Sequence, residues 1–243
     1  MSDDDRIIET FTELAPRYEE VVDAELSAFW GWRYSDFTDH LLEMTPINPD
    51  DRVLDVATGT AVIPRKLQHR LRDDVPIHGL DITPAMLSGA QQMVAAQKSS
   101  HRFCFVCASA MEMPYQSERF DVVTCGLATH HMDAQEMLNE MYRVLRAGGE
   151  LSIADAGLSS VWNLPGIKLL LKLAAFVYYI FKENLDRAWA EAKAVSNIRL
   201  VEEWHEMLAA LGFKDIQITR LRSKYFWIPK PMLIRATKHK TGV

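Results

Sequence analysis

The sequence has few cysteines, no long uninterrupted apolar run and no excess of basic charge. Its 243 residues include only three cysteines, an odd number that rules out a complete disulfide framework and favours a reducing, cytoplasmic compartment. A net charge of −6 argues against a broad nucleic-acid surface. The longest apolar stretch, residues 169–181, contains Lys172 and is too short to span a bilayer. The length of the chain predicts one large domain, or one domain with an insertion.

Two of the cysteines, Cys104 and Cys107, have the spacing of a metal or redox motif. They fall in the apolar run 103–106, which is typical of a strand, and positions three apart on a strand point to opposite faces. We therefore expect buried thiols here rather than a paired site, and we expect no metal ligand set in the chain.

From residue 52 onward, short apolar runs alternate with amphipathic stretches. Repeated strand–helix units of this length predict an α/β fold with a doubly wound, mostly parallel sheet. Seven strands are expected, the last two antiparallel to each other, at 52–56, 77–81, 103–107, 120–125, 150–155, 213–220 and 232–237. Helices are expected between them at 63–71, 84–97, 133–146 and 201–211, with Gly148 and Gly149 ending the third.

Composition divides the chain into four parts. Residues 1–50 mix aromatic and charged side chains and predict an N-terminal helical cap, and residues 51–156 carry the strand–helix rhythm of a binding core. Residues 157–198 are helical and unusually apolar, and residues 199–243 predict a helix and strands that complete the sheet.

The first two expected strands each end in an acidic residue, Asp55 in the first and Asp81 in the second. In doubly wound sheets, ligands bind beyond the carboxyl ends of the strands. A dinucleotide would place its pyrophosphate near Asp55, which is electrostatically unfavourable, and Val62 occupies the position where that motif has a small residue. S-adenosylmethionine is cationic and carries no phosphate, so Asp55 suits its methionine end and Asp81 its ribose hydroxyls.

Four segments in order resemble the motifs of class I S-adenosylmethionine-dependent methyltransferases: 53–61 (VLDVATGTA), 79–87 (GLDITPAML), 108–115 (ASAMEMPY) and 143–149 (RVLRAGG). The resemblance implies the Rossmann-like methyltransferase fold. Within the family, VATGT and the spacing of Phe11, Ala15 and Tyr18 are most similar to the ubiquinone/menaquinone C-methyltransferase branch. That branch usually has an Arg-Asn pair where this chain has His130 and His131.

The resemblance implies S-adenosyl-L-methionine as the cofactor. It assigns thirteen residues to the cofactor site: Tyr18, Asp55, Ala57, Thr58, Gly59, Thr60, Asp81, Ile82, Met86, Ser109, Ala110, Met111 and Leu127. Ala57 and Ala61 replace glycines of the usual first motif, which alanine tolerates if the backbone φ is negative. Ser109 replaces the aspartate that many relatives direct at the adenine.

Two histidines are the candidate catalytic residues. His130 or His131 follows the fourth strand, where an acceptor must approach, and an imidazole is a suitable general base near neutral pH. A packing role for both is the alternative.

The apolar insert is expected to be a lid over the substrate. On a helical projection Lys168, Lys172, Tyr179 and Lys182 form a narrow polar stripe, and apolar residues cover the rest. A homodimer surface and an interfacial membrane helix are the alternatives.

The expected function is S-adenosylmethionine-dependent methyl transfer to a hydrophobic or aromatic small molecule, with C- or O-methylation favoured. The alternative is a protein that binds S-adenosylmethionine without methylating. No nucleic-acid partner is expected, membrane contact is expected only peripherally, and a nicotinamide-dependent oxidoreductase is disfavoured.

Overall fold

A computed structural model describes residues 3–95, 100–158, 164, 166–226 and 228–239. The expected helix end at Gln97 and part of the 157–198 insert lie outside these residues.

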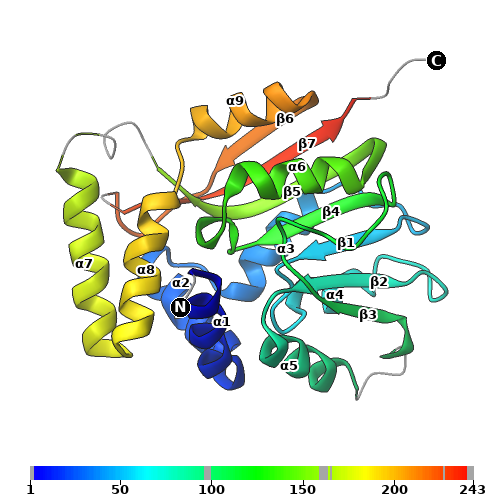
Figure 1. Cartoon of the computed structure of the whole chain (residues 1–243). Helices are drawn as coiled ribbons and strands as arrows, with labels where there is room; N and C mark the ends of the chain where they lie inside the picture. Colours follow the sequence, from blue (N-terminus) through cyan, green and yellow to red (C-terminus); the bar gives the residue numbers. More distant parts are fainter. Residues whose placement is uncertain (1–2, 96–99, 159–163, 165, 227, 240–243) are drawn as a thin grey trace.

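The core is a seven-stranded sheet with the order β3-β2-β1-β4-β5-β7-β6 (Figure 1). The first five strands in the chain run parallel to one another, and β7 runs antiparallel to both β5 and β6. This topology confirms the predicted doubly wound, mostly parallel α/β fold. The strands are β1 (Val53–Val56), β2 (Ile77–Asp81), β3 (Phe103–Cys107), β4 (Phe120–Gly126), β5 (Leu145–Gly157), β6 (Phe213–Arg220) and β7 (Lys230–Lys238).

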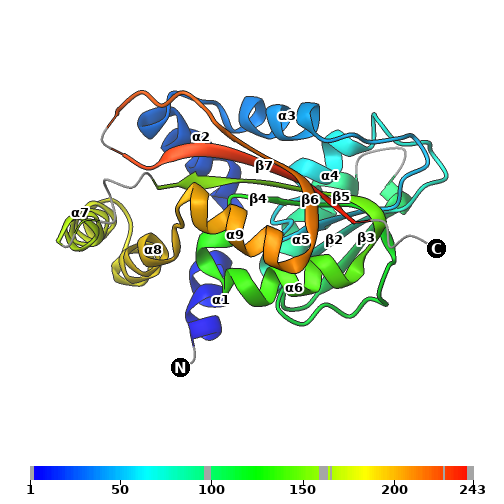
Figure 2. The ribbon, with the colours of Figure 1, turned by 90° about the horizontal axis from the view of Figure 1, so that it is seen from above.

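Helices cover both faces of the sheet. Figure 2 shows α3 and α4 on one face and α6 and α9 on the other. Four more helices, α1, α2, α7 and α8, gather beyond the edge toward which β1 and β4 point (Figure 1). The helices are α1 (Asp3–Leu14), α2 (Tyr18–Phe29), α3 (Tyr34–Met44), α4 (Val62–Leu67), α5 (Pro84–Ala95), α6 (Ala134–Val144), α7 (Ile167–Lys182), α8 (Leu185–Asn197) and α9 (Val201–Leu211).

Two apolar cores hold these layers together. Trp204 of α9 and Met137 of α6 pack with Phe120 of β4 on one face. Phe37 of α3 and Leu67 of α4 pack on the other face. All of these side chains are almost fully buried, and a buried side chain of this size stabilises the fold by roughly 1.5–3 kcal/mol. The sheet is therefore a rigid platform for the loops at its carboxyl edge.

The third predicted helix ends earlier than expected. Asp133 caps α6 by accepting hydrogen bonds from the backbone N–H groups of Gln135 and Glu136, as the sequence predicted. The helix stops at Val144, and β5 begins at once, so the expectation that Gly148 and Gly149 end a helix is wrong. A Cβ on Gly149 would lie 2.8 Å from the Asp121 carbonyl oxygen, so this glycine permits a close approach of β5 to the start of β4.

The expectation of two buried thiols near residue 105 is also wrong. Cys104 is half-buried and Cys107 is exposed. The reason is topological, because β3 is an edge strand of the sheet and one side of it lacks a neighbour.

The buried and exposed faces of α7, in the insert, differ from those that the helical projection suggests. Tyr179, which the projection groups with three lysines in a polar stripe of α7, is only 8% exposed and lies against the guanidinium of Arg187 on α8. The outward face is instead apolar and includes Leu170 and Phe181, which are 67% and 87% exposed. The packing of α7 on α8 therefore buries the tyrosine of this stripe, which the projection alone does not predict.

Candidate active site

The loop after β1 is built from left-handed residues. Ala57, Gly59 and Ala61 have φ values of 54°, 53° and 64°. The condition under which alanine replaces glycine without strain is therefore not met, and each alanine costs about 1–2 kcal/mol of backbone strain. A Cβ on Gly59 would lie 3.5 Å from the Tyr18 ring, so α2 closes down on this loop.

Asp81, at the end of β2, anchors the loop and also faces a cavity. Its carboxylate accepts hydrogen bonds of 2.9 Å from the backbone N–H groups of Gly59 and Thr83. Burial raises its pKa, although both of these hydrogen bonds oppose that shift. The remaining lone pairs can accept hydroxyl hydrogens from a ligand.

Asp55, at the tip of β1, faces the protein interior. Its two oxygens accept hydrogen bonds of 2.7 Å from the hydroxyls of Thr58 and Thr124. Burial raises the pKa of this carboxyl to about 7. Asp55 thus fixes the loop to β4 and does not line the neighbouring cavity.

A first cavity of about 80 Å³ lies between this loop, β2 and the residues after β3. Three of the thirteen predicted cofactor residues, Asp55, Thr58 and Thr60, do not line it. The other ten line it: Tyr18, Ala57, Gly59, Asp81, Ile82, Met86, Ser109, Ala110, Met111 and Leu127. Further lining residues that the sequence reasoning missed are Ile7, Leu80, Thr83, Ala128 and Met132.

A second cavity of about 430 Å³ lies under the N-terminal helices and the insert. Phe11, Tyr18, Leu127 and His131 line both cavities, so the two spaces meet at these side chains. The walls of the second cavity are mostly apolar and aromatic. They include Phe29, Trp30, Leu171, Ala174, Ala175, Tyr178 and Tyr179.

His130 lines the second cavity and is held by a carboxylate. Its Nδ1 lies 2.6 Å from Oδ1 of Asp155, which is fully buried at the end region of β5. Burial lowers the pKa of His130, but the charge and hydrogen bond of Asp155 outweigh burial and raise it overall. The sequence analysis missed Asp155, although it ends an expected strand as Asp55 and Asp81 do.

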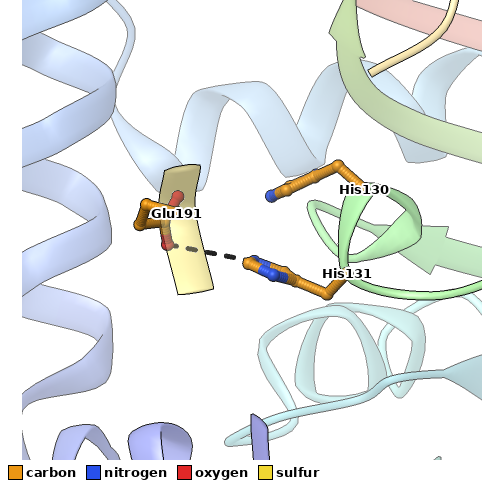
Figure 3. Close-up of side chains that lie close together, drawn as sticks. All are labelled: His130, His131 and Glu191. Carbon is orange, nitrogen blue, oxygen red and sulfur yellow. Dashed lines mark ion pairs between the residues drawn. The ribbon is translucent and has the colours of Figure 1, made fainter. Parts of the chain in front are cut away.

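His131 differs from its neighbour in charge. Burial, assisted by the charges of His130 and Arg187, holds its pKa well below the ordinary value, so its ring is neutral. Figure 3 shows the two imidazoles directed toward Glu191 of α8. The donor atoms of these three residues lie within 4.8 Å of one another, a spacing from which they could hold a metal ion. Glu191 Oε1 is however 3.0 Å from Arg187 Nη2, which already neutralises this carboxylate.

The family of this chain follows from its match to a known protein family. Residues 1–221 match the ubiE/COQ5 methyltransferase family. The chain belongs to this family. Proteins similar to this chain include the demethylmenaquinone methyltransferase of Lactobacillus johnsonii, 29% identical over 87% of this chain and 86% of the relative. Another is the ubiquinone/menaquinone biosynthesis C-methyltransferase UbiE of Geotalea daltonii, 30% identical over 88% and 90%.

Solved structures share the fold of this ubiE/COQ5 family methyltransferase. The geranyl diphosphate C-methyltransferase of Streptomyces coelicolor, solved with Mg²⁺, geranyl diphosphate and S-adenosyl-L-homocysteine, superposes with a TM-score of 0.67. It is 14% identical and aligns over 91% of this chain and 84% of its own. At this identity the likeness concerns the fold alone.

The chain is thus a class I S-adenosylmethionine-dependent methyltransferase, and the side chains around its first cavity have the chemistry that suits this cofactor. A buried carboxylate with free lone pairs, Asp81, stands beside a loop glycine and the apolar side chains of Ile82 and Met111. This set offers a hydrogen-bond acceptor for ribose hydroxyls and apolar surfaces for a base. Among the described residues, no helix has the length and apolar character that a membrane crossing requires.

Proposed function

We propose that this methyltransferase transfers a methyl group to carbon or oxygen of an apolar aromatic molecule in the second cavity. The observation that carries the proposal is the junction of the two cavities at Tyr18, Leu127 and His131. A methyl donor in the first cavity and an aromatic acceptor in the second would meet there. The names of the relatives support a quinol-like ring as one such acceptor.

We propose that S-adenosylmethionine binds in the first cavity. Asp81 is proposed to accept hydrogen bonds from the ribose hydroxyls, and Ile82 and Met111 are proposed to contact the adenine. Asp55 then acts as a positioning residue, because its carboxylate holds Thr58 and Thr124. When bound, S-adenosylmethionine supplies an electrophilic methyl group on a positively charged sulfur. The residues of this chain orient the reactants and exclude water.

His130 is the proposed general base. Asp155 holds Nδ1 of the imidazole, so Nε2 is the nitrogen that can take a proton from a phenolic or activated carbon acceptor. His131, neutral and shared by both cavities, is proposed to pack against the reacting groups. Its ring stacks edge-on against Phe11 with a centroid distance of 5.2 Å.

The helices α7 and α8 are proposed as the lid of the second cavity, because they contribute much of its wall. The outward apolar residues of α7, such as Leu170 and Phe181, support the two remaining proposals for this face. These are peripheral contact with a membrane surface and a homodimer.

The three free cysteines of the described chain are compatible with a reducing compartment.

Methyl transfer is tested directly with S-adenosylmethionine carrying a labelled methyl group and a panel of phenols, quinols and aromatic polyketides. We expect label in an aromatic product and equimolar S-adenosylhomocysteine. A His130→Ala variant should lose turnover but keep cofactor binding, whereas His101→Ala, an exposed histidine outside both cavities, should keep both. Full cofactor binding with no product over the whole panel would contradict the proposal.

A further inference from the structure

Arg187 is a buried arginine in the second cavity with unused hydrogen-bond donors. Its side chain is 7% exposed, and its Nη2 lies 3.0 Å from Glu191 Oε1 and 3.6 Å from Glu25 Oε2. Its Nε and Nη1 have no hydrogen-bond partner among the described residues. Buried donors without a partner are uncommon in folded proteins, and each costs about 1–3 kcal/mol. Such donors are accounted for if a ligand supplies the missing acceptor.

The guanidinium of Arg187 is fixed in orientation. It lies over the ring of Phe11 at 5.6 Å and over the ring of Tyr179 at 5.4 Å. Contacts with two aromatic rings hold the guanidinium between α1 and α7. The unused donors are therefore pre-organised, so a ligand pays little in ordering this side chain.

Glu25 of α2 offers the complementary atom. It lines the same cavity, and its Oε1 is buried with no hydrogen-bond partner among the described residues. Burial raises the pKa of Glu25, although Arg187 opposes the shift. Arg187 and Glu25 thus both line the cavity and carry unpaired polar atoms, donors on Arg187 and an acceptor on Glu25, in a wall that is otherwise mostly apolar.

We propose that Arg187 and Glu25 form a subsite for a neutral hydroxyl group of the methyl acceptor, a phenol or an enol. The proposal rests on the proposed function, because it takes the second cavity as the acceptor site. A hydroxyl accepts a hydrogen bond from Arg187 and donates one to Glu25, and it is the smallest group that does both. The subsite sets which edge of the ring faces away from the methyl donor, so it determines both specificity and the position that is methylated.

Charge excludes anionic groups from this subsite. The same cavity is lined by three carboxylates, Glu25, Asp155 and Glu191, against one permanent cation, Arg187. A carboxylate or phosphate would face Glu25 directly, and like charges in a poorly solvated cavity repel strongly. The subsite is therefore expected to select a neutral hydroxyl over an acid of the same shape.

The test compares the binding of three bicyclic probes to the protein saturated with S-adenosylhomocysteine. The probes are 1-naphthol, 1-methylnaphthalene and 1-naphthoate, and their dissociation constants are measured by calorimetry or tryptophan fluorescence. We expect the unmodified protein to bind 1-naphthol at least about tenfold more tightly than either of the other two. Arg187→Lys and Glu25→Gln should each reduce this preference to less than about threefold.

Controls separate this subsite from general damage to the fold. Arg102 is a buried arginine that donates to backbone carbonyls and lines neither cavity. Arg102→Lys is expected to lower the melting temperature and to leave the preference among the probes unchanged. Glu25→Gln retains the size and shape of the side chain, so it keeps the test meaningful if Arg187→Lys folds poorly.

The outcomes distinguish this proposal from the proposed function. Equal affinity for the three probes, failure to bind 1-naphthol, or an unchanged preference in Glu25→Gln would overturn the subsite. Absence of methyl transfer to every aromatic acceptor, with the probe preference intact, would instead reject the proposed function. A preference for 1-naphthoate would reverse the assignment of charge and would also overturn the subsite.

Discussion

Nδ1 of His130 lies 2.6 Å from Oδ1 of Asp155, and this contact joins the turn after β4 to the end region of β5. Asp155 also accepts hydrogen bonds from the backbone N–H groups of Thr129 and Ala156. The carboxylate is therefore fixed before the imidazole binds to it. Its charge overcomes the effect of burial and raises the pKa of His130. A histidine whose pKa is raised in this way acts as a base only at pH values above that raised pKa, where its imidazole is neutral.

Replacing Asp155 by Asn is expected to shift the pH profile of methyl transfer. In the unmodified enzyme, kcat should rise with pH through the raised pKa of His130, because only the neutral imidazole accepts a proton. Asp155→Asn removes the stabilising charge, so the rising limb should move to lower pH and kcat should fall by about 100-fold. Initial rates between pH 5 and 9 measure both effects. An unchanged rising limb in Asp155→Asn would remove His130 as the base.

Replacing Asp81 by Asn is expected to weaken cofactor binding. The carboxylate accepts from Gly59 and Thr83 with lone pairs left for the ligand, whereas an amide supplies one oxygen and places N–H groups against backbone donors. The dissociation constant for S-adenosylhomocysteine, measured by calorimetry, should rise by at least about tenfold. Asp55→Asn serves as the comparison and should raise it by less than about threefold. A larger loss in Asp55→Asn than in Asp81→Asn would reverse the roles assigned to the two carboxylates.

The parts of the site that sequence could predict are local ones. Asp81 follows an apolar strand and precedes a Thr-Pro helix start, so its place at the sheet edge depends on neighbouring residues alone. Asp155 carried the same signal and could have been found by the same reasoning. Asp55 had that signal too, but its orientation depends on Thr124 of β4, which is 69 residues away in the chain.

Arg187 and Glu25 lay beyond the reach of sequence patterns. Both occupy amphipathic helices in which a charged residue is normally solvated. Their burial results from the packing of α8 against α1 and α2, far from either residue in the chain. The same limit applied to α7, where a projection of its own sequence could not predict that Tyr179 is buried.

The left-handed alanines also could not be identified from sequence, because alanine is compatible with either sign of φ in a loop. Ala57 has a φ of 54° and is only partly buried, so a change to glycine relieves strain without opening a core cavity. Ala57→Gly is expected to raise the free energy of unfolding by about 1 kcal/mol. Urea denaturation followed by circular dichroism measures it. Ala85→Gly, a partly buried alanine within α5, should instead lower stability by about 1 kcal/mol and is the control. Destabilisation by Ala57→Gly would contradict the strain assigned to this position.

Chelation is expected to leave methyl transfer unchanged. His130, His131 and Glu191 have metal-ligand spacing, but Arg187 already pairs with Glu191 at 3.0 Å. Protein treated with EDTA and exchanged into metal-free buffer should retain its kcat, and metal analysis of the purified protein should find no stoichiometric transition metal. Loss of activity on chelation that Zn²⁺, Mn²⁺ or Mg²⁺ restores would establish these three residues as a metal site.

Replacing Asp55 by Asn is expected to make the cofactor-free protein more stable at neutral and alkaline pH. Burial raises the pKa of Asp55 to about 7 in the folded state, whereas an unfolded aspartate has a pKa near about 4. Between these values the unfolded chain binds fewer protons, so this residue lowers the free energy of unfolding as pH rises from about 4 to about 7. Asn keeps the shape without the charge. The variant should match the unmodified protein near pH 4 and exceed it at pH 8 by on the order of 3 kcal/mol.

Asp121 provides the control of opposite sign for that measurement. Burial raises its pKa, but the hydrogen bonds from Arg52 and the charge of Arg146 outweigh burial and lower the pKa overall. Asp121→Asn should therefore be less stable than the unmodified protein at pH 8, and the difference should shrink as the solution is acidified below about pH 4. Urea titrations of both variants at several pH values give the two curves. If Asp55→Asn followed the same course as Asp121→Asn, the buried carboxyl at the tip of β1 would be ionised and stabilising, and its assignment as a positioning residue of raised pKa would have to be abandoned.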